Sequence, residues 1–550
     1  ALLGPASAEA KDKQRKEHRD RALDYLTQGL KLHGQRDRRV AVDLPLFRLL
    51  WHKTNLLLDD LERLDLSSVR RDAGSTSEQR QAWRTEVSQM IEQARRTRGS
   101  PAACDFLKAR LLLLDRHWAK AVTLFEQARP TLGGQVELAG QINRYLGQCY
   151  EQLAEPGQMF KAYERLRENE PNSIAAQLGM AQAEWMLHHF DKAAEIFNRL
   201  ARSRQMPAKA WLDYARLELE RQIQQGQLDW NEFQEVLNPA EKANPDAVEV
   251  PLLKAQGRML QGDLETAHQI LLEAQAEKIW KDSPELWTAR MSLELRGKQG
   301  NQVARARELL AEAKRQLGDR VVLLRLAEAR LLAKENGKAA ELAINRLAAN
   351  LDEFKTQTDQ AQLLSGLADV QLSLENTRAA RALWQRVAKL SSRRGDLTLQ
   401  MLLFDLSRKL EDEAGVRQAI DSIRAVEGSQ GPFHRLGEAL RLIWQAEKMS
   451  PDERPQLLDE ARANLDRVEA LRPQWPPVYT ARAQVEALAG RKDQVRKNLL
   501  MAINNGESSP AVIREYVALL LRDSPDDEAT QREVERVLKK VSEPLLSHSE

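Results

Sequence analysis

The stretch that decides the fold is residues 140–171, GQINRYLGQCYEQLAEPGQMFKAYERLRENEP. Its marker residues are Leu146, Gly147, Tyr150, Tyr163 and Pro171. The following stretch, SIAAQLGMAQAEWMLHHFDKAAEIFNRLA, repeats this order when the numbering is shifted by 34 residues, so that Gly147 becomes Ala181 and Tyr163 becomes Phe197. A bulky and small pattern that returns at a fixed period of this length indicates a helical repeat protein.

Further copies of the pattern occur on both sides of this stretch. They are carried by Trp118, Ala121, Phe125 and Ala128, by Trp211, Tyr214 and Ala215, and by Ala461, Pro473, Ala483, Gly490, Leu499 and Ala502. The period is strong over residues 100–215 and 455–505 and degenerate between them, where residues 284–320 need a small insertion around Gly297–Gly300 to stay in frame. Residues 395–425 and 505–545 have a helical pattern without the repeat residues.

These positions resemble the tetratricopeptide repeat, which places Leu-Gly and Tyr on its first helix, Ala and an aromatic residue on its second, and Pro at its end. The resemblance implies an all-α fold, an α-solenoid of antiparallel helix pairs that forms a right-handed superhelix. Small residues are expected where two helices touch, and large residues are expected between one pair and the next. Trp211, Tyr214, Ala215 and Glu218 also match, once, the related half-a-TPR repeat of RNA-processing scaffolds.

We expect three regions along the chain. Residues 1–98 form an irregular helical N-terminal cap, with a loop at 66–79 and a helix at 80–97. Residues 99–505 form the tetratricopeptide-like array, of about ten to twelve helix pairs. Residues 506–550 form C-terminal capping helices and a tail.

Composition supports a helical protein without a large sheet. The chain has 550 residues, of which 30% are charged and only 5% aromatic, and its net charge is +2 because 83 basic residues face 81 acidic ones. The two signs are interleaved, which gives little support for polyanion binding. No apolar stretch approaches the length of about 18 residues that indicates a membrane helix.

The sequence lacks the motifs of catalytic and cofactor sites. It contains no phosphate-binding glycine loop, no HExxH and no GxSxG. Cys104 and Cys149 are not in a CxxC pair, and Cys149 is expected to be a buried thiol. His188 and His189 are expected to pack beside Phe190, since neighbouring helix positions point about 100° apart and cannot share a metal ion. We therefore predict that the protein is not an enzyme and uses no cofactor or metal.

The predicted function is to bind a protein partner, either an extended peptide or a helix. In the family that the chain resembles, certain first-helix residues face a concave groove. The corresponding residues in this sequence are Arg144, Gln148, Gln152, Gln182, Trp185 and Arg216. Leu212 and Leu219 fall at further groove positions. Trp and Arg beside Gln form a plausible anchor, because both are enriched at binding hot spots.

Two other functions stay open. The half-a-TPR match and the basic residues within 11–39 keep an RNA-associated role possible. The chain could also be the interaction module of a larger membrane-tethered or enzymatic protein. Cysteine usage favours a cytoplasmic location, whereas a signal or anchor before Ala1 would indicate export or membrane tethering.

Overall fold

The fold was examined in a computed structural model of the chain. It describes residues 5–34, 44–67, 75–97, 99–225, 229–296, 301–354, 356–390, 393, 395–507, 509–523 and 527–538. Contacts divide the chain into two compact units, Ala1–Ala176 and Gln177–Glu550, which are described separately below.

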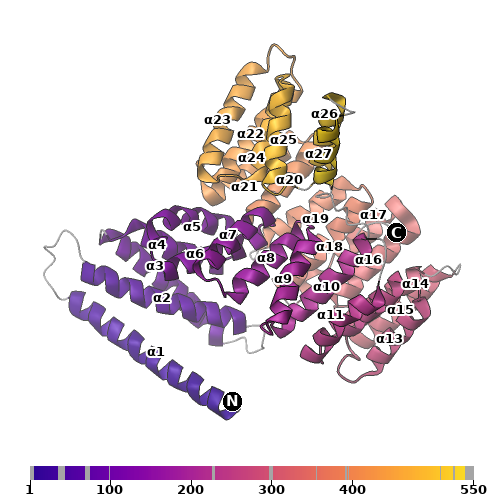
Figure 1. The fold of residues 1–550 in the computed structure, drawn as a ribbon, viewed down its shortest axis with the longest axis horizontal. Coiled ribbons are helices and arrows are strands. Elements are labelled where there is room, and N and C mark those ends of the chain that lie inside the picture. Colours follow the sequence, from indigo (N-terminus) through magenta and orange to yellow (C-terminus); the bar gives the residue numbers. More distant parts are fainter. Residues whose placement is uncertain are drawn as a thin grey trace. The chain divides into compact units, whose positions relative to one another are not determined.

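Unit 1 is built from seven helices and the start of an eighth (Figure 1). They are α1 (Pro5–Gly34), α2 (Leu44–Ser67), α3 (Ser75–Arg96), α4 (Pro101–Leu114), α5 (Trp118–Leu132), α6 (Val136–Gln152), α7 (Pro156–Asn169) and α8 (Ile174–Met186). The boundary between the units falls within α8.

Unit 2 continues with helices and has no strand among its described residues. Its first part holds α9 (Phe190–Arg202), α10 (Ala208–Gln224), α11 (Trp230–Ala243), α12 (Glu249–Leu260), α13 (Leu264–Ala276), α14 (Pro284–Arg296), α15 (Gln302–Leu317), α16 (Val322–Asn336), the short η1 (Gly337–Ala340), α17 (Glu341–Leu347) and η2 (Leu351–Glu353). Its second part holds α18 (Gln357–Ser373), α19 (Thr377–Lys389), α20 (Leu397–Lys409), α21 (Glu413–Glu427), α22 (Pro432–Glu447), α23 (Pro455–Leu471), α24 (Pro476–Leu488), α25 (Lys492–Asn504), α26 (Pro510–Asp523) and α27 (Glu528–Leu538).

Consecutive helices pack in pairs, as predicted. The pairs that contact each other include α2/α3, α4/α5, α6/α7, α10/α11, α12/α13, α14/α15, α18/α19, α20/α21, α22/α23, α24/α25 and α26/α27. Neighbouring first helices also contact each other within a unit, as α2, α4 and α6 do in unit 1 and α10, α12 and α14 do in unit 2. Each pair is therefore covered by the next one, which is the arrangement of an α-solenoid. The all-α, tetratricopeptide-like solenoid is confirmed, and its right-handed twist stays a prediction.

The small residues of the repeat lie where two helices of a pair meet. A Cβ added to Gly147 of α6 would stand 2.5 Å from the ring of Tyr163 in α7, and one added to Gly257 of α12 would stand 2.7 Å from the ring of Trp230 in α11. Ala181 is fully buried at the position equivalent to Gly147. A larger side chain would separate the helix axes, which explains the choice of Gly and Ala.

Aromatic residues join one pair to the next. The ring of Phe125 in α5 stacks on that of Tyr145 in α6, with centroids 5.5 Å apart, and Phe197 in α9 stacks on Tyr214 in α10 at 5.3 Å. Both phenylalanines are buried. Stacked aromatic pairs contribute about 0.5–1.5 kcal/mol beyond the burial of their area, so these contacts stabilise the junctions between pairs.

The turn inside a pair has one recurring geometry. After α4, α6, α8, α12, α18, α20 and α24, one residue adopts a positive φ, namely Arg116, Ala154, His188, Gly262, Glu375, Glu411 and Gly490. The next residue donates its N–H to a carbonyl five residues earlier, as from Glu155 to Tyr150 and from Asp263 to Arg258. This pattern is the Schellman end of a helix, which satisfies carbonyls that would otherwise lack a donor.

Some details differ from the prediction. The helix expected at 80–97 begins at Ser75, so residues 75–79 of the expected loop are helical. Residues 68–74 of that loop and the expected insertion at Gly297–Gly300 lie outside the described residues. The intervals between successive first-helix starts also vary, from 34 residues between 174 and 208 to 44 residues between 432 and 476. This variation explains why the register is degenerate over the middle of the chain.

Candidate functional site

The predicted partner-binding residues of unit 1 lie on one face of α6. Arg144, Gln148 and Gln152 are four residues apart, which places them above one another on a helix. Gln148 and Gln152 are exposed, whereas Arg144 is half-buried. A guanidinium nitrogen of Arg144 lies 3.7 Å from Glu170 Oε2, at the end of α7. Arg144 is thus tied to the second helix of its own pair, and the two glutamines form the accessible part of this face.

The predicted residues of unit 2 gather around Trp185. Trp185 of α8 is half-buried and packs against the apolar cluster that contains Leu212 and Leu219. Its indole Nε1 donates a hydrogen bond of 2.6 Å to Oε2 of Glu220 in α10. Gln182, three residues before Trp185, is also half-buried. Trp185 therefore has its apolar body on the core and its polar edge on the first helix of the next pair.

Arg216 lies one helical turn before Glu220 on α10. Its guanidinium nitrogens are 3.5 Å from Asp213 Oδ1 and 3.5 Å from Oε1 of Glu249 in α12. Both contacts are at the long end of hydrogen bonding, and the Arg216 side chain retains 40% of its exposure. Its charge is consequently only loosely engaged and is accessible from solvent.

Electrostatics distinguish the carboxylates of this surface. Burial raises the pKa of Glu220, against the opposing effects of the Trp185 hydrogen bond and of Arg216. Burial likewise raises the pKa of Asp213, although Arg216 opposes it. Both carboxylates are thus less well compensated than a surface ion pair would be. We call Gln182, Trp185, Asp213, Arg216, Glu220 and Glu249 the Trp185 surface.

The predicted groove leucines are not part of this surface. Leu212 and Leu219 are 6% and 5% exposed and belong to the core. The half-a-TPR match nearby is also explained by packing. Tyr214 stacks on Phe197, and Glu218 is buried and pairs with Arg221 at 2.7 Å. These residues hold α10 in place and are not accessible to a partner.

The histidine pair has a structural role. His188 and His189 lie in the turn after α8 rather than on a helix, and the His188 ring contacts Phe190 edge-on at 5.7 Å. His189 Nδ1 lies 2.6 Å from Glu184 Oε2. The predicted packing beside Phe190 is confirmed. Throughout the described ranges, no group of three His, Cys, Asp or Glu residues is arranged to hold a metal ion.

Both cysteines are free and buried. Burial raises the pKa of the Cys149 thiol far above its usual value, and burial raises that of Cys104 as well. A neutral thiol is a poor nucleophile, so Cys149 is a structural residue, as predicted. Within the part of the chain that the structure describes, no helix is both long and apolar enough to cross a membrane.

Comparisons with known proteins add similarity to two solved structures. No protein-family model and no curated protein sequence matches the chain. The crystal structure of the APC/C hetero-tetramer Cut9-Hcn1 is similar at 12% identity and a TM-score of 0.32, over 96% of this chain and 95% of that one. The structure of Naa15/Naa10 bound to HypK-THB is similar at 13% identity and a TM-score of 0.27, over 90% and 99%. At these values the fold rests on the helix pairs themselves.

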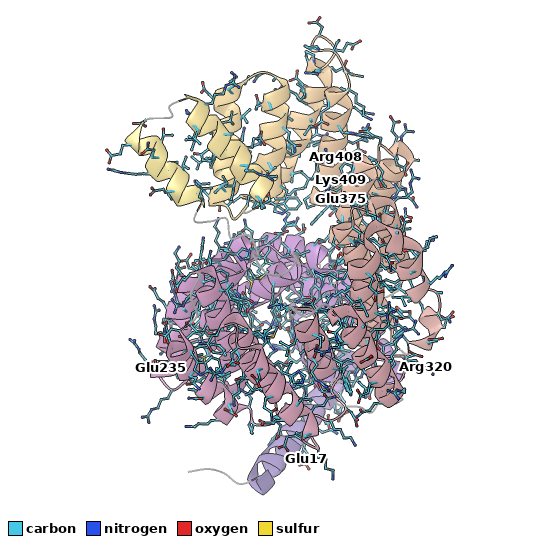
Figure 2. The ribbon with its side chains drawn as sticks, turned by 90° about the vertical axis from the view of Figure 1, so that its right-hand side faces the viewer. Glu17, Glu235, Arg320, Glu375, Arg408 and Lys409 are labelled. Carbon is cyan, nitrogen blue, oxygen red and sulfur yellow. The ribbon has the colours of Figure 1, made fainter. Side chains whose placement is uncertain are left out.

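Charged side chains of both signs lie all over the helices. Glu17, Glu235, Arg320, Glu375 and Lys409 are exposed, and Figure 2 labels them among many other charged side chains of the chain. This distribution agrees with the interleaved signs of the sequence. Within α1, the start of the basic stretch at 11–39, Arg19 is not available to an anion because it is paired with Asp60 at 2.6 Å. Residues 35–39 lie outside the described residues.

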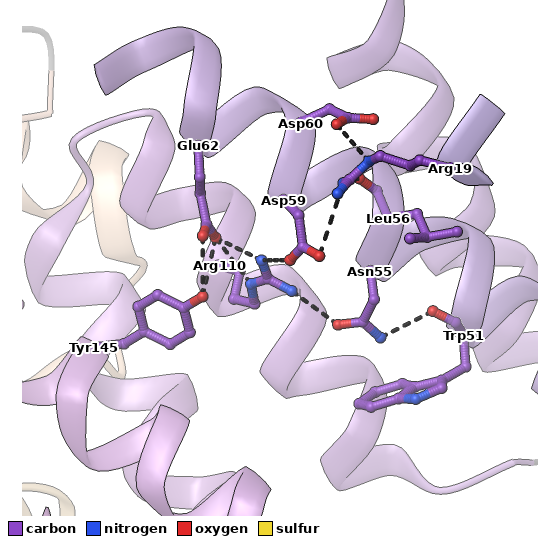
Figure 3. A network of polar contacts seen from close by, with 9 residues as sticks. All are labelled: Arg19, Trp51, Asn55, Leu56, Asp59, Asp60, Glu62, Arg110 and Tyr145. Carbon is purple, nitrogen blue, oxygen red and sulfur yellow. Dashed lines mark hydrogen bonds and ion pairs between the residues drawn. The ribbon is translucent and has the colours of Figure 1, made fainter. Parts of the chain in front are cut away.

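The sequence did not reveal a second polar group, which is buried in unit 1 (Figure 3). Arg110 of α4 is 2% exposed. Its guanidinium donates to Asp59 Oδ1 at 2.7 Å, to Glu62 Oε1 at 2.7 Å and to Asn55 Oδ1 at 2.8 Å, all on α2. The Tyr145 hydroxyl of α6 donates to Glu62 at 3.1 Å. We call these five residues the Arg110 network, and it joins three successive first helices.

Proposed function

We propose that this chain is a non-catalytic protein-interaction scaffold that binds a peptide or helix of a partner protein, as one part of a larger assembly or of a longer polypeptide. The Trp185 surface is the proposed anchor. The observation that carries the proposal is the position of Trp185, a half-buried indole fixed by Glu220 beside the accessible guanidinium of Arg216.

The chemistry of this surface suits a protein ligand. Trp and Arg dominate binding hot spots because they combine a large contact area with directed polar groups. The Glu220 hydrogen bond holds the indole in one orientation before a partner arrives, which lowers the entropic cost of binding. The surrounding Gln182, Asp213 and Glu249 supply polar groups that could form the rim of an interface.

We propose Gln148 and Gln152, with Arg144 beside them, as a separate contact area on α6. Two exposed amides one turn apart can donate to and accept from the backbone of an extended peptide. We also propose that residues 1–98 and 506–550 cap the array of residues 99–505, as the sequence suggests.

A peptide selection with two matched tryptophan variants tests the Trp185 surface. Peptides from a random displayed library are selected on the wild-type chain, and their Kd is measured for Trp185→Ala and for the control Trp280→Ala. Trp280 is also half-buried and also donates its indole N–H to a neighbouring pair, to the Asp246 carbonyl at 3.0 Å. It lies between α13 and α14, away from the Trp185 surface.

We expect Trp185→Ala to weaken binding about 30-fold or more, because truncating a hot-spot residue costs about 2 kcal/mol or more. Trp280→Ala should leave the Kd unchanged. Arg216→Gln should weaken binding less than Trp185→Ala, since it removes charge and leaves the indole. Equal Kd values for the wild type and Trp185→Ala, with both chains folded, would refute the assignment of this surface.

A further inference from the structure

Helix α1 lies antiparallel on α2, and two contacts define its register. Near one end, Arg19 Nη2 donates to the Leu56 carbonyl at 2.6 Å, and Arg19 Nε lies 2.6 Å from Asp60 Oδ1. Near the other end, the backbone of α1 approaches α2 so closely that a Cβ on Gly29 would stand 3.2 Å from Leu49. The residue numbers rise along α1 as they fall along α2, so one continuous face of α2, carrying Leu49, Leu56, Asp59 and Asp60, receives α1.

The attachment of α1 is shallow. Of its residues 16–32, whose side chains are described, none is buried, and Leu23, Leu26 and Leu30 are only half-buried. In α2, by contrast, Leu50, Leu57, Leu58 and Leu61 are at most 3% exposed. Because stabilisation scales with the apolar area removed from water, α1 is held far less firmly than α2. Arg19, whose side chain is only 13% exposed, supplies the main polar contact of α1 with this face.

The receiving face keeps its shape without α1. Asp59 lies 3.8 Å from Arg19 but only 2.7 Å from the buried Arg110, and Glu62 is bound by Arg110 and Tyr145 (Figure 3). The Arg110 network therefore fixes α2 from the side opposite to α1. Release of α1 would leave a preformed face with one uncompensated carboxylate, Asp60, and exposed leucine side chains.

We propose that this face of α2 is a helix-docking site that the α1 helix of a second copy of this chain can occupy, so that two copies exchange α1. The occupant is the one helix whose charge and shape are already seen to fit, with an arginine placed for Asp60 and a glycine placed for Leu49. Exchange of an identical element keeps every contact, and the added cost is that of bringing two chains together. The proposal is independent of the function of the Trp185 surface.

Complementary charge variants of the full chain test the exchange. Arg19→Asp places two carboxylates together in its own α1–α2 contact, and Asp60→Arg places two guanidinium groups together. Neither variant can make a matched contact within one chain or with its own copies. In an exchanged heterodimer of the two variants, the unchanged Arg19 of one chain meets the unchanged Asp60 of the other. The two substituted side chains meet each other with opposite charges, so both contacts of the heterodimer are matched.

We expect each variant alone to be monomeric and the equimolar mixture to form a heterodimer, seen as a doubled mass by light scattering and by native mass spectrometry. The control is the ion pair between Arg482 and Asp466, at 2.6 Å, which joins α24 and α23. A mixture of Arg482→Asp and Asp466→Arg should stay monomeric. Circular dichroism checks that all four variants are folded.

Two outcomes overturn the proposal. One is a mixture of Arg19→Asp and Asp60→Arg that stays monomeric while a chain with both substitutions regains protection of α1 from hydrogen exchange. The other is heterodimer formation in the control mixture as well, which would show association unrelated to α1.

Discussion

Gly147 lies against the ring of Tyr163, so close that a Cβ in its place would stand 2.5 Å from the ring carbons. The two residues belong to α6 and α7, the pair whose sequence first showed the repeat. Tyr163 is 6% exposed and cannot move outward without losing its own packing. This contact sets the distance between the two helices.

Gly147→Ala should therefore destabilise unit 1. Overpacking a close contact costs about 1–3 kcal/mol, and the added methyl group has no space unless the Tyr163 ring shifts. Thermal unfolding followed by circular dichroism, with hydrogen exchange to locate the effect in α6 and α7, measures the loss. Gly134→Ala is the control, because a Cβ at Gly134 meets nothing within 4 Å. A Gly147→Ala chain as stable as the wild type would show that the pair tolerates wider spacing.

Ala154→Gly should stabilise the chain. Ala154 is exposed and has a φ of 52°, a conformation that costs a residue with a Cβ about 1–2 kcal/mol. Glycine removes this strain but has a more flexible unfolded state, so the expected net gain is about 0.5 kcal/mol. The control is Ala311→Gly in the middle of α15, which is also exposed and should lose about 0.5–1 kcal/mol. A lower melting temperature for both variants would contradict this account of the turn.

Arg110→Met should be among the most damaging substitutions in the chain. It leaves Asp59 and Glu62 without their buried cation, and breaking a buried ion pair by removing one partner costs about 3–5 kcal/mol. Tyr145→Phe removes one hydrogen bond to a carboxylate and should cost less, about 1.5–3 kcal/mol. Arg417→Met is the control, because Arg417 is exposed and its pair with Glu413 is worth about 1 kcal/mol or less. Denaturant unfolding ranks the three variants.

Asp412 should make the stability of α21 dependent on acid. It caps this helix by accepting the Gly415 N–H at 3.0 Å and also pairs with Arg381, and both interactions lower the pKa of its carboxyl. A lowered pKa in the folded state gives stabilisation that is present above the unfolded value of about 3.9 and is lost as the pH falls through the folded value.

The difference in melting temperature between the wild type and Asp412→Asn should therefore shrink from pH 7 to pH 3. Asp421→Asn, in the same helix, alters a carboxylate that is 63% exposed and pairs only with Arg424 among the ion pairs described. It should show a smaller difference at pH 7. A difference for Asp412→Asn that is constant with pH would exclude the charge as the source of the cap.

The repeat residues predicted the helix pairs because close packing restricts the residues that fit. Gly147 and Ala181 can be recognised in a sequence, since few side chains are allowed where helices touch. The turns were harder to recognise. Gly262 marks its turn, but the same left-handed conformation is adopted by Arg116, Ala154 and His188, which carry no such signal. The strain of these residues is borne by the Schellman hydrogen bonds and not by residue choice.

The polar partners were missed for a different reason. Trp185 could be singled out as a possible anchor, but Glu220 could be assigned to it only by counting one repeat onward to the next first helix. The Arg110 network joins residues 48 to 55 positions apart, across helices that were treated as an irregular cap. Pairings of this kind depend on which helices become neighbours, and a single sequence does not specify this.

The turns inside the pairs also bear on how such a chain evolves. In seven of the described pairs the two helices are joined by the same three-residue turn, whereas the segments between pairs vary in length. The helix pair with its turn is thus a module whose internal geometry is kept, and insertions or deletions accumulate between modules without disturbing it. A lineage could lengthen or shorten this array by duplicating or losing whole modules, and each new copy would already contain the contacts that hold its two helices together.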